Sequence, residues 1–204
     1  MNYSELVEIL LSDKPSEKLR ERKEELALLI PEFEKSFGFD QKSIWHPYDV
    51  FEHTLRVVDG VNSENCFCLR LAALFHDIGK PYTKDPRGEG HFFGHWDRSK
   101  EIFIRHKDNF YLGFSEFGLV CDLIEFHDLD ISEKNIDRFM KTFSEEEMDQ
   151  LFILKKADIL AQNEEMIMDR LDDLEKQKDF YYATLDKINT NQFTKGKDDY
   201  KWTD

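Results

Sequence analysis

The sequence predicts an all-α protein made of a single helical domain. Apolar residues recur at helical spacing along almost the whole chain, and no two segments show the alternation expected of paired strands. One stretch, Lys80–Gly94, interrupts this pattern with three glycines and two prolines, so we expect it to be the one substantial loop. With 204 residues, the chain is long enough for one domain with a sizeable core.

Two helices are expected at the N-terminus. The first carries an apolar face and ends before Pro15, and the second covers Ser16–Ile30 with opposed charges at helical spacing. Pro31 ends the second helix, because proline lacks the amide hydrogen that a helix interior requires. We assign residues 1–43 to an N-terminal helical extension.

The next two helices contain the most informative residues. Pro47 suits the first turn of a helix that runs through Val61. Glu64–Ile78 forms the following helix, and its strongly apolar sequence indicates a central position in the core. Gly79 is expected to end it.

Apolar residues recur at helical spacing again after the loop, and this pattern continues to Ile188. Ser115 and Ser144 are expected to act as N-caps. A last acidic segment, Glu164–Ile188, has an apolar stripe that can pack on the domain or pair with a second copy in a homodimer; we expect packing. With the polar tail it makes up residues 164–204. The helices expected between the loop and this segment are Trp96–Asn109, Ser115–His127, Ser132–Phe143 and Glu145–Asn163.

The charge balance excludes several classes of partner. The chain has 28 basic and 43 acidic residues, for a net charge of −15, so it lacks the basic stripe that long nucleic acids or anionic membranes require. Lys80–Lys100, however, contains five basic and three acidic residues, so a small anionic substrate can approach there. Three cysteines without a pairing pattern, and the lack of a signal or membrane segment, predict a cytoplasmic protein.

Several histidines and an aspartate lie on faces that are otherwise apolar. His53, His76, His127 and Asp158 each follow apolar residues three or four positions earlier in separate predicted helices. A buried lone carboxylate or imidazolium is costly, whereas imidazole and carboxylate groups that share a divalent cation satisfy one another. Asp77 can join His76 at one metal only near a helix end, because neighbouring helical residues diverge by about 100°.

Four segments that contain these residues resemble the HD-domain metal-dependent phosphohydrolases. The similarity is greatest to the HD domain of bacterial tRNA nucleotidyltransferases and of stand-alone relatives, and it covers residues 44–163. About 45 residues precede the motif, too few for a nucleotidyltransferase domain, so CCA addition is not expected. The segments are HPYDVFEHTLRVVDGV, LRLAALFHDIGKP, HFFGHWDRSKEIF and KKADILAQN.

The resemblance implies roles for individual residues. It makes His53, His76, Asp77 and Asp158 the primary metal ligands, with Asp77 bridging a second ion held by His95 and His127. One or two ions of Mn, Fe, Ni, Co, Zn or Mg are expected. The resemblance also implies that Lys80 contacts the substrate phosphate. His127 is followed by Asp128, where some two-metal relatives have paired histidines.

These roles predict a hydrolytic chemistry. A metal with open positions lowers the pKa of bound water toward ~7, and Asp77 and Lys80 would be the catalytic side chains that orient the water and neutralise the phosphate. In the loop, Lys84, Arg87 and His91 are candidate substrate-binding residues. Tyr82, Phe92 and Phe93 offer aromatic faces for a base, or pack the loop on the domain.

The sequence therefore predicts an enzyme that hydrolyses phosphoric esters. We expect a phosphomonoesterase or cyclic-nucleotide phosphodiesterase that acts on a small nucleotide or a phosphate end. Two alternatives remain at this point: a di-iron oxygenase that uses the same ligands, and a regulatory module that binds a nucleotide without turnover.

Overall fold

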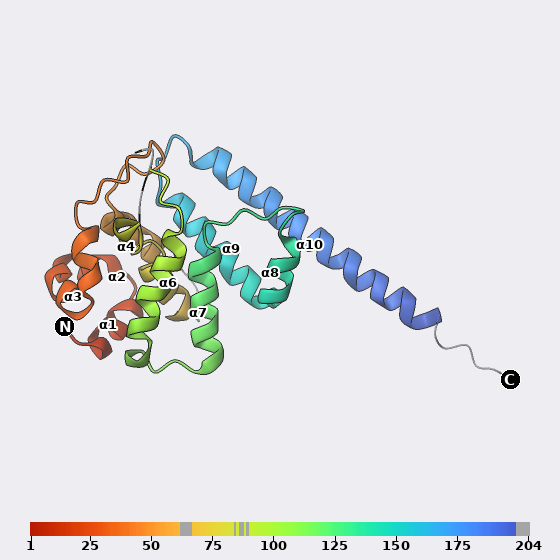
Figure 1. The fold of residues 1–204 in the computed structure, drawn as a ribbon, viewed down its shortest axis with the longest axis horizontal. Helices are drawn as coiled ribbons and strands as arrows, with labels where there is room; N and C mark the ends of the chain where they lie inside the picture. Colours follow the sequence, from red (N-terminus) through yellow and green to blue (C-terminus); the bar gives the residue numbers. More distant parts are fainter. Residues whose placement is uncertain (62–66, 84, 86–87, 89, 199–204) are drawn as a thin grey trace.

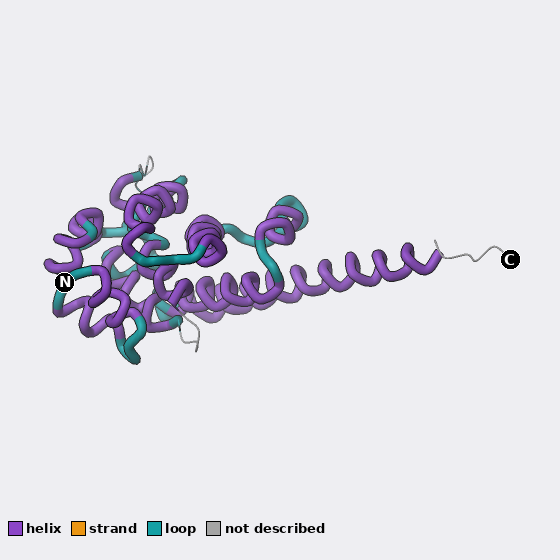
Figure 2. Tube along the Cα trace, turned by 90° about the horizontal axis from the view of Figure 1, so that it is seen from below, coloured by secondary structure: helices purple, strands orange, loops and turns teal. Residues whose placement is uncertain are grey.

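Every regular element of the described chain is a helix, which confirms the predicted fold class (Figures 1 and 2). The computed structural model describes residues 1–61, 67–83, 85, 88 and 90–198, with side chains described up to residue 190. No helix in these ranges is both long and apolar enough to span a membrane. The elements are α1 (Tyr3–Leu10), α2 (Pro15–Glu21), α3 (Lys23–Leu29), η1 (Pro31–Ser36), α4 (Val50–Gly60), α5 (Phe67–Phe75), η2 (Lys80–Tyr82), α6 (His95–His106), η3 (Lys107–Asn109), α7 (Phe114–Phe126), α8 (Ile136–Thr142), α9 (Glu145–Leu160) and α10 (Ile167–Asp198).

Helix α5 lies at the centre of the fold, as its apolar sequence predicts. It contacts α1, α4, α6, α7 and α9, and every residue from Leu69 to Phe75 is buried. The ring of Phe75 packs edge-on against Phe103 of α6, with 5.4 Å between ring centroids. The residues that follow α5 are therefore held at the middle of the helical bundle.

The chain leaves α5 earlier than the sequence predicts. The helix ends at Phe75 instead of Ile78, and residues 76–79 form a turn; residues 64–66 of the expected helix lie outside the described residues. Gly79 does not end the helix in a left-handed conformation, since its φ is −76°. Its backbone instead packs directly on the start of α6, where its N–H donates to Ser99 Oγ at 2.9 Å.

Two predicted boundaries in the first half of the chain are wrong. Ser16–Ile30 is not one helix, because it breaks at Arg22 (φ −114°, ψ 27°), which lets α2 lie on α4 while α3 folds against η1. Pro47 lies before α4 rather than in its first turn. Asp49 caps that helix instead, accepting the Glu52 N–H at 2.7 Å.

The later boundaries are partly confirmed. Ser144 caps α9 through a capping box with Glu147, as predicted. Ser115 is not an N-cap: Gly113 takes that place, and its N–H donates to Glu116 at 2.7 Å. The helix expected over Ser132–Phe143 starts only at Ile136, because Asn135 holds the preceding residues in a turn.

The last helix starts on the body of the protein and extends beyond it (Figures 1 and 2). Its first part packs on α9, where Leu174 and Tyr181 are buried and the Tyr181 ring meets the edge of Phe152. The predicted packing of this segment is therefore present over its first turns.

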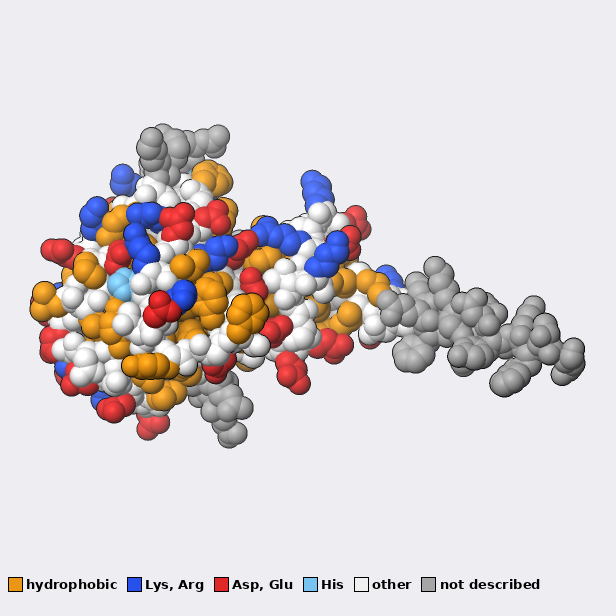
Figure 3. Space-filling view, turned by 60° about the horizontal axis from the view of Figure 1, so that its bottom comes forward, with side chains coloured by type: hydrophobic (Ala, Val, Ile, Leu, Met, Phe, Trp, Pro, Cys, Tyr) orange, Lys and Arg blue, Asp and Glu red, His pale blue; other side chains and the backbone are white. Residues whose placement is uncertain are grey.

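On the face drawn in Figure 3, Lys and Arg side chains are interspersed with Asp, Glu and hydrophobic groups.

The close packing of Gly79 on α6 gives a stability prediction. A Cβ at this position would lie 2.7 Å from the backbone nitrogen of Ser99 and still closer to the His95 carbonyl oxygen. Because backbone atoms cannot move aside cheaply, Gly79→Ala is expected to lower the free energy of unfolding by about 1–3 kcal/mol. Urea denaturation followed by circular dichroism measures this.

Gly118→Ala is the matched control. Gly118 lies inside α7, and a Cβ there would meet nothing within 4 Å. This change is expected to raise the free energy of unfolding by about 0.5–1 kcal/mol, since alanine loses less entropy than glycine in a helix. Equal effects of the two substitutions would contradict the close-packing argument.

Candidate metal centre

Six buried side chains from five segments meet between the central helices. His53 comes from the middle of α4, and Asp158 from the last turns of α9. The other four lie at helix ends: His76 and Asp77 in the turn after α5, His95 at the first position of α6, and His127 just after α7. Each of the six is at most 8% exposed. The structure thus brings together all the residues predicted as metal ligands.

The turn after α5 explains how two adjacent residues face one point. In a continuous helix the side chains of His76 and Asp77 would diverge. Because α5 ends at Phe75, both are released from helical geometry, and His76 Nε2 lies 3.2 Å from Asp77 Oδ2. The expectation that this pair needs a helix end is confirmed, although the end lies three residues earlier than predicted.

Each of the four imidazoles is oriented by the hydrogen bond of its Nδ1 atom. The partners are backbone carbonyls: Ala73 for His76 at 2.7 Å, Ile124 for His127 at 2.7 Å, Phe92 for His95 at 2.9 Å, and Ala161 for His53 at 3.4 Å. A carbonyl only accepts, so Nδ1 carries a hydrogen and Nε2 points to the centre, where it presents a lone pair in the neutral ring and an N–H in the protonated ring. This arrangement is typical of metal-binding histidines.

The Nε2 atoms converge on the carboxylates of Asp77 and Asp158. His53 Nε2 lies 2.8 Å from Asp158 Oδ1 and 3.4 Å from His76 Nε2. On the other side, His95 Nε2 lies 3.2 Å from Asp77 Oδ1 and 3.3 Å from His127 Nε2. Two overlapping groups result, each with its ligand atoms within 4.8 Å of one another: His53, His76 and Asp158, and His76, Asp77 and His127.

Asp77 supplies the observation that tests whether a cation fits. Its Oδ1 atom is buried and has no hydrogen-bond partner among the described residues, although His95 and His127 point their Nε2 atoms at it. An acceptor oxygen that faces two acceptor nitrogens is unfavourable unless a positive charge lies among them. The donor set of imidazole and carboxylate therefore fits one or two divalent ions. Asp77 Oδ2 faces His53 and His76, and its Oδ1 faces His95 and His127.

The carboxylates remain ionised in this buried place. Burial by itself would raise the pKa of Asp77, but the charges of His76 and Lys80 outweigh it and hold that pKa well below its usual range. The pKa of Asp158 is likewise lowered, because the hydrogen bond and charge of His53 outweigh burial. Burial would lower the pKa of His76, yet the Asp77 and Asp158 carboxylates raise it. A proton on His76 thus competes with a metal for the same position.

Lys80 lies directly beside this centre. Its ammonium group is buried, and donates to Asp77 Oδ2 at 2.6 Å and to Gln41 Oε1 at 2.9 Å. It also lines the cavity of about 760 Å³ into which Asp77, His95, His127 and Asp158 open. The lysine that the resemblance assigns to the substrate therefore lies beside the metal ligands in the wall of the same cavity.

The other predicted substrate-binding residues are only partly placed. His91 lines the cavity, and its exposed ring stacks on Phe93, with centroids 5.8 Å apart. Lys84 and Arg87 lie outside the described residues. Tyr82 does not line the cavity, because its hydroxyl donates to the Glu32 carbonyl at 3.2 Å and packs the loop on η1.

Some residues of the site carry no signal in the sequence. Gln41, the acceptor for Lys80, lies in an irregular segment twelve residues before the first ligand, His53. His46 also lines the cavity and packs edge-on against His53, with centroids 5.0 Å apart. Burial, followed by the charge of Lys80, lowers the pKa of His46 to about 3, so this ring is neutral at pH 7.

The region that contains these residues matches a known protein family. A family model described as HD domain matches residues 44–176. The "Multifunctional CCA protein" of Dechloromonas aromatica is 38% identical over 97 residues, which are 44% of this chain and 23% of that protein. The "CC-adding tRNA nucleotidyltransferase" of Thermus thermophilus is 39% identical over 106 residues, 48% of this chain and 24% of that protein. The chain spans about a quarter of the length of these relatives.

Metal binding is expected to stabilise the protein. After removal of metal with a chelator, addition of Mn²⁺ should raise the unfolding free energy by about 2.7 kcal/mol at a hundredfold excess over Kd. Asp158→Asn should abolish most of this gain, because it removes a charged ligand of the first group. Asp137→Asn, an exposed change in α8, is the control and should leave the gain intact. Thermal unfolding with and without metal measures all three proteins.

Metal affinity is expected to fall as the pH falls. The Asp77 and Asp158 carboxylates raise the pKa of His76, so lowering the pH through this pKa protonates the ligand, and the proton must leave when the metal binds. Below that pKa, the affinity should drop about tenfold per pH unit for each displaced proton. Calorimetric titration in two buffers of different ionisation enthalpy measures the released protons. A pH-independent affinity between pH 5.5 and 8 would contradict this.

Proposed function

The chain belongs to the HD-domain family, and we propose that it is a metal-dependent phosphohydrolase. Its substrate would be a small nucleotide or a phosphate end, hydrolysed as a phosphomonoester or a cyclic phosphodiester. The observation that carries this proposal is the double role of Asp77. One of its oxygens faces the ligand histidines, and the other accepts from Lys80, which lines the cavity.

The chain's own residues are suited to binding a phosphate group. When bound, a divalent ion supplies a water of lowered pKa and draws negative charge from the phosphate oxygens. Lys80 provides a fixed positive charge beside the ligands, and its hydrogen bonds to Asp77 and Gln41 hold it there. A phosphate that reaches the centre would thus meet a preorganised ammonium group, which stabilises charge without reorganisation during the reaction.

Water is the expected nucleophile. Among the described residues that line the cavity there is no cysteine, and Ser43 supplies its one hydroxyl group. The Ser43 Oγ accepts from the backbone N–H of Trp45 at 3.3 Å rather than contacting a histidine. No serine or cysteine in the described part of the cavity is therefore activated by a histidine for covalent catalysis.

The names of the relatives describe nucleotide addition, which we do not propose for this chain. The matched region is about a quarter of each relative, and the activity in the name belongs to the whole protein. A di-iron oxygenase is the second candidate, since the two ligand groups share His76 and the two oxygens of Asp77 face different histidines. The buried ammonium of Lys80 beside that carboxylate favours an anionic substrate and hence the hydrolase.

Lys80→Met tests the hydrolase proposal. The metal-loaded protein should hydrolyse nucleoside monophosphates or 2′,3′-cyclic nucleotides, and this change should lower kcat/KM by about a hundredfold, the usual effect of removing one charge-stabilising donor. Lys141→Met, at an exposed position in α8, should leave the rate unchanged. Elemental analysis accompanies the assay: two irons with O₂ consumption and no ester hydrolysis would replace the proposal by the oxygenase.

A further inference from the structure

A second cavity opens beside the metal centre. It has a volume of about 390 Å³ and lies next to the main cavity, with which it shares part of its wall. We call it the side cavity. Its volume falls within the range of small-molecule sites in proteins. The residues common to both cavities are Trp45, His127, Asp128, Asp158 and Arg170.

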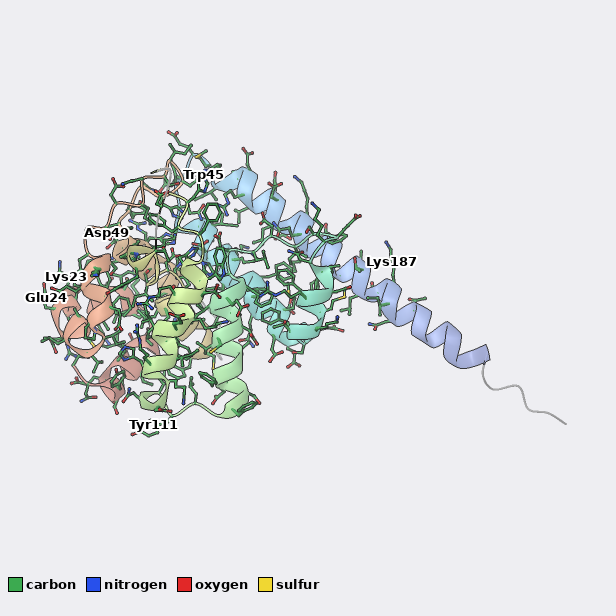
Figure 4. The ribbon with its side chains drawn as sticks, viewed as in Figure 1. Lys23, Glu24, Trp45, Asp49, Tyr111 and Lys187 are labelled. Atoms are coloured by element: carbon green, nitrogen blue, oxygen red, sulfur yellow. The ribbon has the colours of Figure 1, made fainter. Side chains whose placement is uncertain are left out.

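Trp45 and Arg170 come from distant parts of the sequence and are held together at this wall. Asn163 donates its backbone N–H to the Trp45 carbonyl at 2.9 Å. Arg170, in the second turn of α10, donates to Gln162 Oε1 at 3.1 Å, and Gln162 in turn contacts Asp158. The Arg170 guanidinium carbon lies 5.7 Å from the centre of the Trp45 ring. Figure 4 labels Trp45 beside the start of α10.

The Arg170 guanidinium has capacity for a ligand. Arg20 and Arg56 both pair with Glu52, and such pairing is frequent in this acidic chain. Within the ranges that the structure describes, Arg170 forms no ion pair, and its one hydrogen bond goes to the neutral Gln162. A planar guanidinium beside an indole ring offers a flat, polarizable surface on which a nucleobase can stack.

The charge around the side cavity decides which end of a nucleotide it suits. The ammonium of Lys155 is buried, donates to the His127 carbonyl at 2.8 Å, and is the only lysine in this lining. The remaining charged lining is mostly carboxylate, which repels phosphate and accepts hydrogen bonds from hydroxyl and amino groups. The aspartates of this lining are Asp128, Asp130, Asp158, Asp169 and Asp173.

We propose that the side cavity binds the nucleoside half of the substrate, with the base stacked on Trp45 and Arg170. The orientation of the substrate rests on the phosphohydrolase proposal, in which the phosphate lies near Lys80 in the main cavity. The nucleoside then extends into the side cavity. The sugar hydroxyls and base amino groups would donate to the surrounding carboxylates. A nucleoside monophosphate fits this division of charge, whereas a second phosphate on the nucleoside would meet the aspartates.

Binding of a nucleoside without phosphate tests the proposal independently of turnover. Calorimetric titration of the purified protein with adenosine and with cytidine should give saturable binding. Trp45→Leu should weaken it about tenfold, the effect of losing one base–aromatic stack. Trp45→Phe, which keeps an aromatic ring, should retain binding within about threefold and shows that the site is otherwise intact. Adenosine 3′,5′-bisphosphate should bind more weakly than adenosine 5′-monophosphate.

Phe114→Leu is the matched control. Phe114 is an exposed aromatic residue at the start of α7, outside both cavities, and its change should leave adenosine binding unchanged. Phe93→Leu, in the main cavity, distinguishes the two candidate surfaces for the base. No binding of either nucleoside, or a loss with Phe93→Leu and not with Trp45→Leu, would overturn the proposed subsite. Hydrolysis of glycerol 3-phosphate without nucleoside binding would overturn the subsite alone, whereas nucleoside binding without any ester hydrolysis would overturn the hydrolase alone.

Discussion

The carboxylate of Asp77 is the group on which the arrangement of the core depends. It is 1% exposed, and its two oxygens face in different directions. Lys80 satisfies Oδ2, but Oδ1 is surrounded by imidazole nitrogens that accept rather than donate. A buried charge of this kind is tolerated only with a compensating positive charge. The ends of α5, α6 and α7 meet around this one atom, so the bundle is packed about a position that calls for a cation.

Helix ends, rather than helix faces, supply most of the ligands. His76 and Asp77 follow α5, His95 begins α6 and His127 follows α7, and the glycine at position 79 allows the α5 turn and the α6 start to touch. Only His53 and Asp158 project from within helices. This division has a physical reason: side chains at a helix end are free of the fixed angular spacing, so several can be aimed at one point.

The sequence was sufficient for the fold class and for the set of residues that meet in the core. Apolar periodicity identified the helices, and polar residues on apolar faces identified His53, His76 and Asp158. It was insufficient where tertiary packing decides: the break at Arg22, the early end of α5 and the Gly113 cap all follow from neighbouring elements. Trp45 and Arg170 could not be identified, because they come together only when α10 folds back over the segment before α4.

The carbonyl partners of the histidines have a consequence for how the centre acquires its metal. Three of them belong to the residue three positions before the histidine, namely Ala73 for His76, Phe92 for His95 and Ile124 for His127. The ring orientation is therefore built into short stretches of chain and does not await the ion. The affinities of a preassembled set of nitrogen and oxygen donors for divalent ions follow the Irving–Williams order. Which divalent ion would occupy the centre in a living cell then depends on which metals the cell keeps available.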